Sequence, residues 1–489
     1  MMTPTMRNSL MTLSSTSKAL WMALACVGAL AFSGCVSSAA DCAPGLESCG
    51  SACIDPMNDK ANCGGCGIAC GALQICTEGV CGCREGTTDC NGACVATESD
   101  GQHCGACGNV CGELEVCADS TCVRAAYGLV GICGSNATVV GLSDAGDAGA
   151  PVATGVTGLQ AIGQYEGNPL VSTYGNQILQ YNAFLAPVGE PLTTGGSPME
   201  VLADPPYLYA VASLDNTLHI FEAGGADARG GYSFSSVGAL NFGPNTSPQD
   251  IARIGETLYV PLYGNLMSEP GDDPGQRIAV VDISDRTQPQ VVSHIDLRGL
   301  DLMPHPDATP RATPHGIIVH REHLYLPLNS YQPSYTPGGP GMLAKVDPVS
   351  GEATTVVLDP DGCENVYDLV AVGDMLVASC AGKAVYDAAW NTVAVEKSAI
   401  VLLDVNDAHV ETYPFVCTSE DCPLAKAGRM AVKGEQVYIS DEAGRVVILA
   451  VGPEGFTEVR GFSAEAPKEP LQLCYGGTYN NVADLVALP

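Results

Sequence analysis

From about residue 125 to the C-terminus, short runs of Val, Leu, Ile and Tyr alternate with polar residues, and Gly, Pro, Asn and Asp separate the runs. A two-residue period predicts strands with one buried face, and the turn residues predict tight antiparallel connections. No long segment shows the apolar period of an amphipathic helix. In the clearest stretch, residues 250–297, this pattern predicts four antiparallel strands joined in order.

The four-strand unit recurs with low sequence identity. Its second strand recurs at Leu170, Leu208, Leu258, Leu324, Met375 and Val437, and a third strand follows each copy. Four-stranded units that repeat about every 40–60 residues predict a β-propeller, whose radial arrangement protects the sheet edges. A closing unit should combine residues 128–143 with the C-terminal segments 471–477 and 480–488. We therefore predict an all-β propeller over residues 125–489, with seven blades and six as the alternative.

Residues 42–122 follow a different pattern. Two copies of one eight-cysteine motif begin at Cys42 and Cys83, with identical spacing and a period of 41 residues. Each copy is rich in Gly and poor in Leu, Ile and Phe, so its stability must come from cross-links. Zinc is the alternative to disulfides, because Cys63-x-x-Cys66 has a zinc-ligand spacing. The even cysteine count and the presence of a single nearby histidine, His103, favour disulfides. The sequence does not specify which cysteines pair.

Two stretches resemble known families. NCGGCGIAC and HCGACGNVC, with the upstream CGSACID and CNGACVA, resemble the stigma-specific family of small secreted cysteine-rich proteins. This resemblance covers residues 42–122 and implies no catalytic residue. In the propeller, IAVVDISDRTQPQVVSHIDL resembles the LVIVD-type repeat of bacterial surface propellers. That resemblance implies a propeller fold and a surface location, but no known reaction.

The first 34 residues have the pattern of an export signal. Arg7 and Lys18 accompany an apolar run over residues 19–32, and Ser33-Gly34 precedes Cys35. Small residues before a cysteine resemble a bacterial lipobox, which predicts that Cys35 becomes the lipidated first residue of the mature chain. Residues 35–41 would then link the lipid anchor to the cysteine-rich module. We expect a lipoprotein at the outer membrane or cell surface; ordinary secretion is the alternative.

Charge and motifs exclude several functions. The chain has 54 acidic and 21 basic residues, for a formal net charge of −33. This surface repels phosphate backbones and anionic lipid headgroups, so we expect no nucleic-acid binding and membrane contact only through the lipid anchor. No phosphate loop, dinucleotide fingerprint, HExxH motif or nucleophile elbow is present, so no cofactor is predicted. Five histidines lie between His294 and His323, but they should fall on different faces, so no metal is predicted.

Residues at the start of each blade's first strand are candidates for a binding site, because this strand lines the central channel. One column contains Met199, Gln249, His315, Tyr367 and Gly428, and the next contains Glu200, Asp250, Gly316, Asp368 and Arg429. These side chains could bind a ligand. The alternative is a solvated channel wall in which Asp368 pairs with Arg429, since buried charges are normally paired.

Long insertions predict a partner-binding face. The start of the first strand, the connection between the second and third strands, and the connection between blades all emerge on one face. Insertions there begin at Asn265, Arg298, Ser330 and Gly382. Together with His315 they carry residue types that dominate binding hot spots: Met303, Tyr331, Tyr335, Tyr386 and Trp390. Flexible Pro- and Gly-rich padding is the alternative interpretation.

The six cysteines after residue 122 can pair fully. Cys363 precedes a first strand and Cys380 ends the next, so we pair them. Cys417 and Cys422 could close a small ring within one loop. Cys133 and Cys474 lie near opposite ends of the propeller, and a bond between them would lock the closing blade.

Together, these features predict an envelope-anchored binding or scaffold protein. Its partner would be an envelope or extracellular protein or a glycan. The alternative is an exported propeller enzyme, either a hydrolase or lactonase or a redox enzyme. It would use the channel residues Glu200, Asp250, His315 and Asp368.

Overall fold

The computed structural model describes residues 42–488, with gaps at 51, 72, 99, 101, 112–114, 119, 125–126, 135–136, 143–147, 266–273, 304–310, 330–339, 387–391, 417–424, 442, 463–467 and 475–481. The chain divides into two compact units, Met1–Gly108 and Asn109–Pro489. The division falls within the second cysteine-rich copy, before the boundary at residues 122–125 that the sequence suggests. Among the described residues, no helix is long and apolar enough to cross a membrane.

The cysteine-rich copies are built from short β-hairpins. Copy one contains β1 (Glu47–Cys49) paired with β2 (Ala52–Ile54), and β3 (Gln74–Thr77) paired with β4 (Val80–Cys83). Copy two contains β5 (Thr88–Cys90) paired with β6 (Ala93–Val95), and β7 (Glu115–Ala118) paired with β8 (Thr121–Arg124). Gly50, Gly79 and Gly92, all with positive φ, lie in the turns of three of these hairpins.

Disulfides cross-link both copies in the same order. Copy one contains Cys42–Cys53, Cys49–Cys66, Cys63–Cys76 and Cys70–Cys81. Copy two contains Cys83–Cys94, Cys90–Cys107 and Cys111–Cys122, and Cys104 and Cys117 are also disulfide-bonded. The prediction of disulfides is therefore confirmed.

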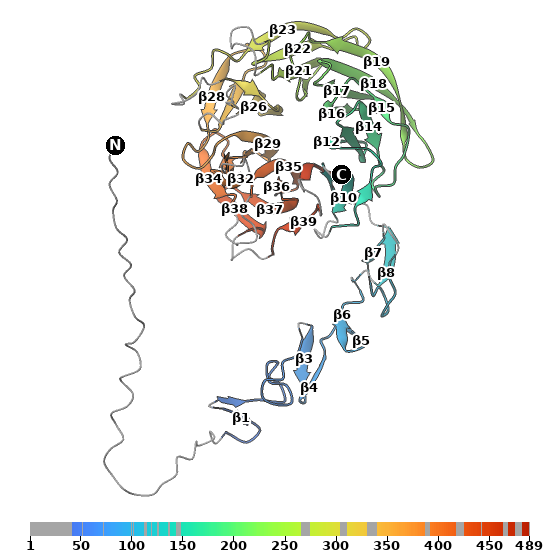
Figure 1. Ribbon diagram of the computed structural model, residues 1–489, viewed down its shortest axis with the longest axis vertical. Helices are drawn as coiled ribbons and strands as arrows, with labels where there is room; N and C mark the ends of the chain where they lie inside the picture. The colour runs from blue at the N-terminus through green and yellow to red at the C-terminus, as the bar shows by residue number, and fades with distance from the viewer. Residues whose placement is uncertain are drawn as a thin grey trace, which may run out of the picture. The chain divides into compact units, whose positions relative to one another are not determined.

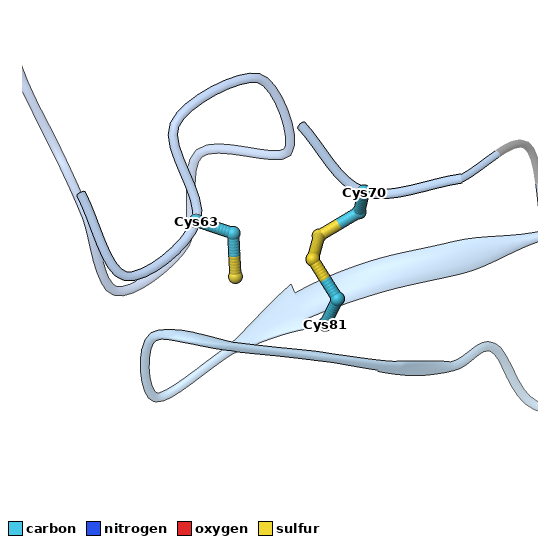
Figure 2. Close-up of side chains that lie close together, drawn as sticks. All are labelled: Cys63, Cys70 and Cys81. Atoms are coloured by element: carbon cyan, nitrogen blue, oxygen red, sulfur yellow. A yellow bond between two sulfur atoms is a disulfide. The ribbon is translucent and has the colours of Figure 1, made fainter. Parts of the chain in front are cut away.

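Two groups of cysteines have the compactness of a metal site: Cys63, Cys70 and Cys81 in copy one, and Cys104, Cys111 and Cys122 in copy two. The sulfur atoms of Cys63, Cys70 and Cys81 all lie within 4.8 Å of one another (Figure 2). Zinc binds thiolates, however, and each of these sulfurs is already in a disulfide, with Cys76 as the partner of Cys63. The close sulfur packing thus reflects two neighbouring disulfides.

The second unit contains a seven-bladed β-propeller, in which the sheets form a ring (Figure 1). Blade 1 contains β12 (Leu159–Tyr165), β13 (Asn168–Thr173), β14 (Gln177–Gln180) and β15 (Leu192–Thr193). Blade 2 contains β16 (Pro198–Asp204), β17 (Tyr207–Ala212), β18 (Thr217–Ala226) and β19 (Tyr232–Asn241). Blade 3 contains β20 (Ala252–Ile254), β21 (Thr257–Leu262), β22 (Arg277–Asp282) and β23 (Gln290–Asp296).

The later blades carry additional strands. Blade 4 contains β24 (Thr313–Pro314), β25 (Ile318–His320), β26 (His323–Asn329), β27 (Met342–Val346) and β28 (Ala353–Val357). Blade 5 contains β29 (Val366–Val372), β30 (Met375–Cys380), β33 (Ala399–Leu403) and β34 (His409–Pro414), with a separate hairpin of β31 (Lys383–Tyr386) and β32 (Thr392–Glu396). Blade 6 contains β35 (Ala427–Lys433), β36 (Gln436–Asp441), β37 (Arg445–Gly452), β38 (Gly455–Arg460) and β39 (Leu471–Gln472).

Blade 7 closes the ring with strands from both ends of the propeller. It contains β9 (Leu129–Cys133), β10 (Thr138–Leu142), β11 (Val152–Ala153) and the innermost β40 (Val482–Ala487). The pairing of β40 with β9 confirms a closing blade of mixed origin. The assignment of residues 471–477 to this blade is wrong in one respect, because β39 pairs with β37 of blade 6. The Cys133–Cys474 disulfide, with Cα atoms 5.7 Å apart, ties blade 7 to the segment after β39.

The hydrophobic core lies between neighbouring blades. One cluster joins Tyr209 and Val211 of blade 2 to Leu258 and Val260 of blade 3. Each middle strand is sandwiched between two blades, so both of its faces are covered. Every residue of β33 is therefore buried, and the strand is a continuous apolar run rather than an alternating one.

Candidate functional site

Irregularities in the innermost strands shape the centre of the propeller. In β16, β29 and β40 the pairing register shifts where one extra residue is inserted: Met199, Tyr367 and Ala483. Similar shifts occur in β12 and β35. Blade 4 is interrupted at the same point, between β24 and β25. A β-bulge redirects side chains, so consecutive residues of these strands can both face the channel.

Five charged side chains meet at this level in a cavity of about 240 Å³. We call them the charged ring: Glu200, Asp250, Asp368, Arg429 and Asp484. Gly316, the remaining member of the predicted column, also lines the cavity. The first four belong to one predicted column of the innermost strands, whereas Asp484 was not predicted. The ring contains four carboxylates and one guanidinium, so the cavity wall carries an excess of negative charge when all are ionised.

Three of the carboxylates connect neighbouring blades. Asp484 in blade 7 accepts a hydrogen bond from its neighbour Leu485 (2.8 Å) and another from the backbone N–H of Ile162 in blade 1 (3.0 Å). The same arrangement recurs where Asp250 accepts from Ile317 (2.8 Å) and where Asp368 accepts from Met430 (2.7 Å). Each of these aspartates therefore has a structural role between blades, whatever else it does.

Glu200 and Arg429 are less fully engaged. Glu200 accepts a hydrogen bond from Val201 at 3.1 Å through Oε1, and none of the described residues donates to its Oε2. The Arg429 guanidinium lies 3.7 Å from Asp368 and 5.5 Å from the centre of the Tyr367 ring. The ion pair predicted between Arg429 and Asp368 is therefore present, at a separation longer than a hydrogen bond.

Burial changes the protonation of the ring. It raises the pKa of Asp250 and of Asp484 to about 6. Burial, with the charges of Asp250 and Asp484, holds the pKa of Glu200 well above its ordinary value. Burial also raises the pKa of Asp368, despite the neighbouring Arg429. The one guanidinium does not compensate four carboxylates, so the ring retains protons that exposed carboxylates would lose.

Aromatic side chains lie one residue earlier along the innermost strands. The ring of His315 is 5.1 Å from that of Tyr367 and 6.2 Å from that of Tyr263. Burial and the charge of Arg429 lower the pKa of His315 to about 4, so its imidazole is neutral at pH 7. Its Nδ1 is buried and has no hydrogen-bond partner among the described residues. In the same column, Gln249 donates to the Ser247 carbonyl at 3.1 Å.

The expected partner-binding residues are only partly described. Tyr331, Tyr335, Trp390, Cys417, Cys422 and the anchor Cys35 lie outside the described residues. Tyr386 ends β31, but its side chain is not described. Met303 lines a groove of about 550 Å³ along β28, the outermost strand of blade 4. Because His315 lies at the innermost strands, the structure does not bring Met303 and His315 together.

The predicted disulfides that fall on described residues are both present. Cys363 pairs with Cys380, with Cα atoms 5.4 Å apart, and Cys133 pairs with Cys474.

Comparison with known proteins identifies no family, because no family model and no curated protein matches the chain. Solved structures with some likeness include apo AztD from Citrobacter koseri, with 12% identity and a TM-score of 0.45 over 74% of this chain and 97% of that one. A second AztD structure has 13% identity and a TM-score of 0.44 over the same shares. The WD40 domain of Neurospora crassa Pan2 has 10% identity and a TM-score of 0.41 over 61% and 80%. These distant likenesses carry no inference about function.

Proposed function

We propose that the protein is an exported binding or scaffold protein anchored in the cell envelope. The propeller would be the binding head, the cysteine-rich module its stalk, and a lipid on Cys35 its anchor. The disulfides of both units indicate an oxidising compartment outside the cytoplasm. The partner would be an envelope or extracellular protein or a glycan.

One observation carries the proposal: the propeller directs five charged side chains into a central cavity, and the strands that line it also carry aromatic side chains. The charged ring lines it. Tyr263 lies beside His315, and His315 and Tyr367 lie one residue nearer the face where the innermost strands begin. We call this face the entry face. Concave sites with a few convergent polar groups are the usual places for ligands.

Insertions on the entry face support a large partner. Successive strands of a blade run in opposite directions, so the connections between second and third strands emerge where the first strands begin. In blade 5 this connection includes the β31–β32 hairpin. In blade 4 it includes Tyr331 and Tyr335. Long connections in a compact domain are uncommon unless they are functional or disordered, and tyrosine is enriched in binding hot spots.

A specific observation also favours an enzyme as the second candidate. Asp250 and Asp484 have pKa values of about 6, close to the range in which carboxylates exchange protons near neutral pH. Both nevertheless accept backbone hydrogen bonds through both oxygens. No nucleophile paired with a base lies among the described residues of the cavity wall. We therefore rank binding above catalysis.

The test is affinity capture from native envelope with the purified ectodomain. Two triple variants remove aromatic groups. The first combines Tyr263→Ala, His315→Ala and Tyr367→Ala beside the cavity. The second combines Tyr331→Ala, Tyr335→Ala and Trp390→Ala in the inserted connections. We expect each to reduce capture of the partner at least about tenfold, the effect of 1.4 kcal/mol. If correctly folded variants capture every partner as the parent does, the binding face lies elsewhere.

A matched control uses the opposite face. Val349 and Val405 are 96% and 49% exposed, and they lie in turns between third and fourth strands. Val349→Ala with Val405→Ala should leave capture unchanged. Cys35→Ser tests the anchor independently, because loss of the lipid should release the protein from the membrane fraction. Unchanged membrane association would reject the lipid anchor but not the binding face.

A further inference from the structure

Copy one of the cysteine-rich module exposes large aliphatic side chains. Met57, Ile68, Ile75 and Val80 are 53%, 55%, 47% and 67% exposed. A single exposed apolar residue is ordinary, but several around one surface feature indicate an interaction site. We call these four residues the aliphatic patch.

The hairpin of β3 and β4 organises the patch. Cα pairing joins Ile75 to Gly82 and Thr77 to Val80, so Ile75 and Val80 lie on the same face of the hairpin. Cys76 and Cys81 lie directly opposite each other in the strand register, and their side chains are on the other face of the hairpin. The hairpin therefore directs its sulfur atoms inward and its aliphatic side chains outward.

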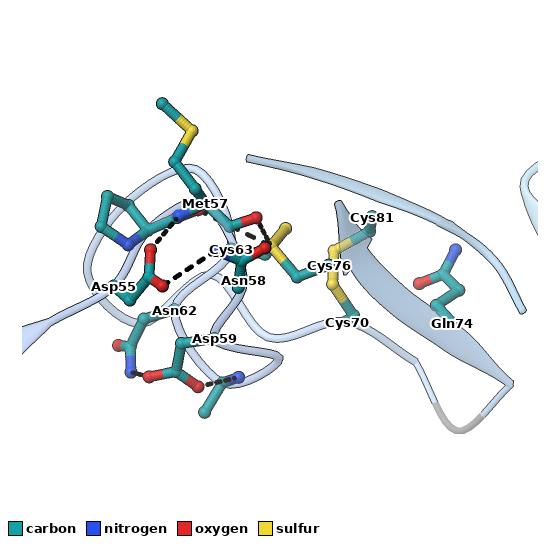
Figure 3. The surroundings of a disulfide bond; sticks show 12 residues. Asp55, Met57, Asn58, Asp59, Asn62, Cys63, Cys70, Gln74, Cys76 and Cys81 are labelled. Carbon is teal, nitrogen blue, oxygen red and sulfur yellow. Dashed lines mark hydrogen bonds between the residues drawn. A yellow bond between two sulfur atoms is a disulfide. The ribbon is translucent and has the colours of Figure 1, made fainter. Parts of the chain in front are cut away.

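The other two residues of the patch, Met57 and Ile68, lie on the loop that contacts this hairpin at Gly79. Met57 accepts a hydrogen bond from Gly79 at 3.1 Å through its carbonyl, and its Sδ lies 3.4 Å from where a Cβ on Gly79 would be. Ile68 packs over Gly65, and the preceding Gly64 also contacts Gly79. Met57 therefore lies at the turn of the hairpin, and Ile68 lies on the loop whose Gly64 contacts this turn. Figure 3 shows Met57 on the loop beside Cys76.

Copy two provides an internal comparison, because it has the same cysteine spacing. The equivalents of Met57, Ile68 and Val80 are Glu98, Asn109 and Thr121, all exposed. The equivalent of Ile75 is Val116. The disulfide framework therefore does not require aliphatic residues at three of the four positions. Their presence in copy one needs another reason.

We propose that the aliphatic patch inserts into the surface of a lipid bilayer. Copy one contains no Phe, Trp, Tyr or Arg, so it lacks the residues that dominate protein–protein hot spots. Met, Ile and Val are side chains that a hydrocarbon phase accepts. This would give the protein a membrane contact in addition to the lipid anchor, whereas the net charge alone predicts contact through the anchor only.

The chain position favours a bilayer as the occupant, and this step rests on the proposed anchor. Cys42, the first cysteine of copy one, follows Cys35 by seven residues, which span at most about 25 Å when fully extended. A lipid on Cys35 would therefore keep copy one beside the bilayer. Glu78 at the hairpin turn and the other acidic residues of copy one would oppose anionic headgroups, so we expect a preference for zwitterionic lipid.

Vesicle flotation tests the patch without the anchor. The full mature chain carrying Cys35→Ser would be mixed with phosphatidylcholine vesicles, and its partition constant measured. We expect association, and a fall of at least about tenfold, equivalent to 1.4 kcal/mol, for the added triple variant Met57→Glu, Ile68→Asn and Val80→Thr. Copy two carries these residues on the same framework, so the variant should fold.

The reciprocal exchange is the matched control. Glu98→Met, Asn109→Ile and Thr121→Val should increase vesicle binding, because they reproduce the patch in copy two. The proposal is overturned if the Cys35→Ser protein does not float with vesicles, or if the triple variant floats equally well. It is also overturned if the patch mediates only self-association, seen as a dimer by light scattering. Failure of the lipid anchor would not change these results, because the Cys35→Ser protein lacks it.

Discussion

The two units of this protein are stabilised in different ways. Among the described residues of the cysteine-rich copies, the buried side chains are almost all cysteines, such as Cys63 and Cys104. In the propeller, the buried side chains are mainly Val, Leu, Ile and Tyr, packed between blades. Covalent bonds maintain the first unit, and burial of apolar surface maintains the second. The two regions should therefore fail under different perturbations.

Reduction should produce the largest difference between them. Each disulfide of the module contributes about 2–4 kcal/mol, and a copy of this size has little else to stabilise it. We expect dithiothreitol to unfold both copies while the blades keep their strands. Amide hydrogen exchange followed by segment would show loss of protection in residues 42–122 only. Retained protection there would mean that something other than disulfides holds the module.

Removal of one propeller disulfide should lower the free energy of unfolding of the propeller without unfolding it. The loss should depend on the length of the loop that the disulfide closes. Cys133 and Cys474 are 341 residues apart, and Cys363 and Cys380 only 17. In the chain-entropy treatment, the first bond contributes about 6 kcal/mol and the second about 3 kcal/mol. Thermal unfolding of Cys133→Ala/Cys474→Ala should show the larger loss, with Cys363→Ala/Cys380→Ala as control. Equal losses would contradict the entropic explanation.

The polar contacts between blades should contribute a smaller amount. Asp484→Ala would leave the Ile162 N–H without its acceptor, at a cost of about 1–3 kcal/mol. Glu200→Ala is the matched control, because Glu200 accepts only from its own neighbour, Val201. Urea unfolding would measure both. A smaller loss for Asp484→Ala than for the control would show that the contact between blades 7 and 1 is not a stabilising one.

The difference between the units also explains what the sequence could predict. The second strands of the blades could be located because burial on both faces makes them nearly continuous apolar runs, as in β30. The pairing of cysteines could not, because eight cysteines in one copy allow 105 connectivities and local spacing does not select among them. Strand β39 was misplaced because its pairing with β37 depends on how the chain ends meet, not on a local pattern.

The charged ring could be predicted only in part, because a local sequence pattern does not show how the two chain ends meet in the closing blade. Tyr367-Asp368-Leu369 and Gln249-Asp250-Ile251 share the order of a channel residue, a carboxylate and an apolar residue. Ala483-Asp484-Leu485 repeats that order and could have identified Asp484. It was missed because the closing blade is split between the chain ends, which hides its register. The bulges that bring these residues together leave no clear signal in the sequence.

The smallest predicted effect is a difference in how the two units respond to pH. In copy one, the side-chain amide of Asn58 donates to Asp55 at 2.9 Å, and that of Asn62 donates to Asp59 at 2.8 Å (Figure 3). These bonds lower the pKa of both carboxyls. Carboxyls with a lowered pKa in the folded state stabilise it when ionised. The module should therefore lose stability as the pH falls through these pKa values.

The propeller should respond in the opposite direction. Asp250 and Asp484 have pKa values of about 6 in the folded state, because burial raises them above the ordinary value of an exposed aspartate. The folded state thus binds more protons than the unfolded state between about pH 4 and 6, so stability rises as the pH falls through that range and is lost as it rises.

Glu200→Gln separates this effect from other titrations, because it removes a carboxylate whose pKa is raised by burial and by its neighbours' charges. At pH 7.5 the variant should be more stable than the parent, because burial and the neighbouring carboxylates disfavour the ionised form of Glu200. Near pH 4 the difference should disappear, because the parent's Glu200 is then protonated as well. Urea unfolding of both proteins at several pH values would measure it. If the difference in free energy of unfolding is the same at every pH, packing and not ionisation distinguishes the two proteins. If the variant is less stable than the parent at pH 7.5, the charge of Glu200 stabilises the ring.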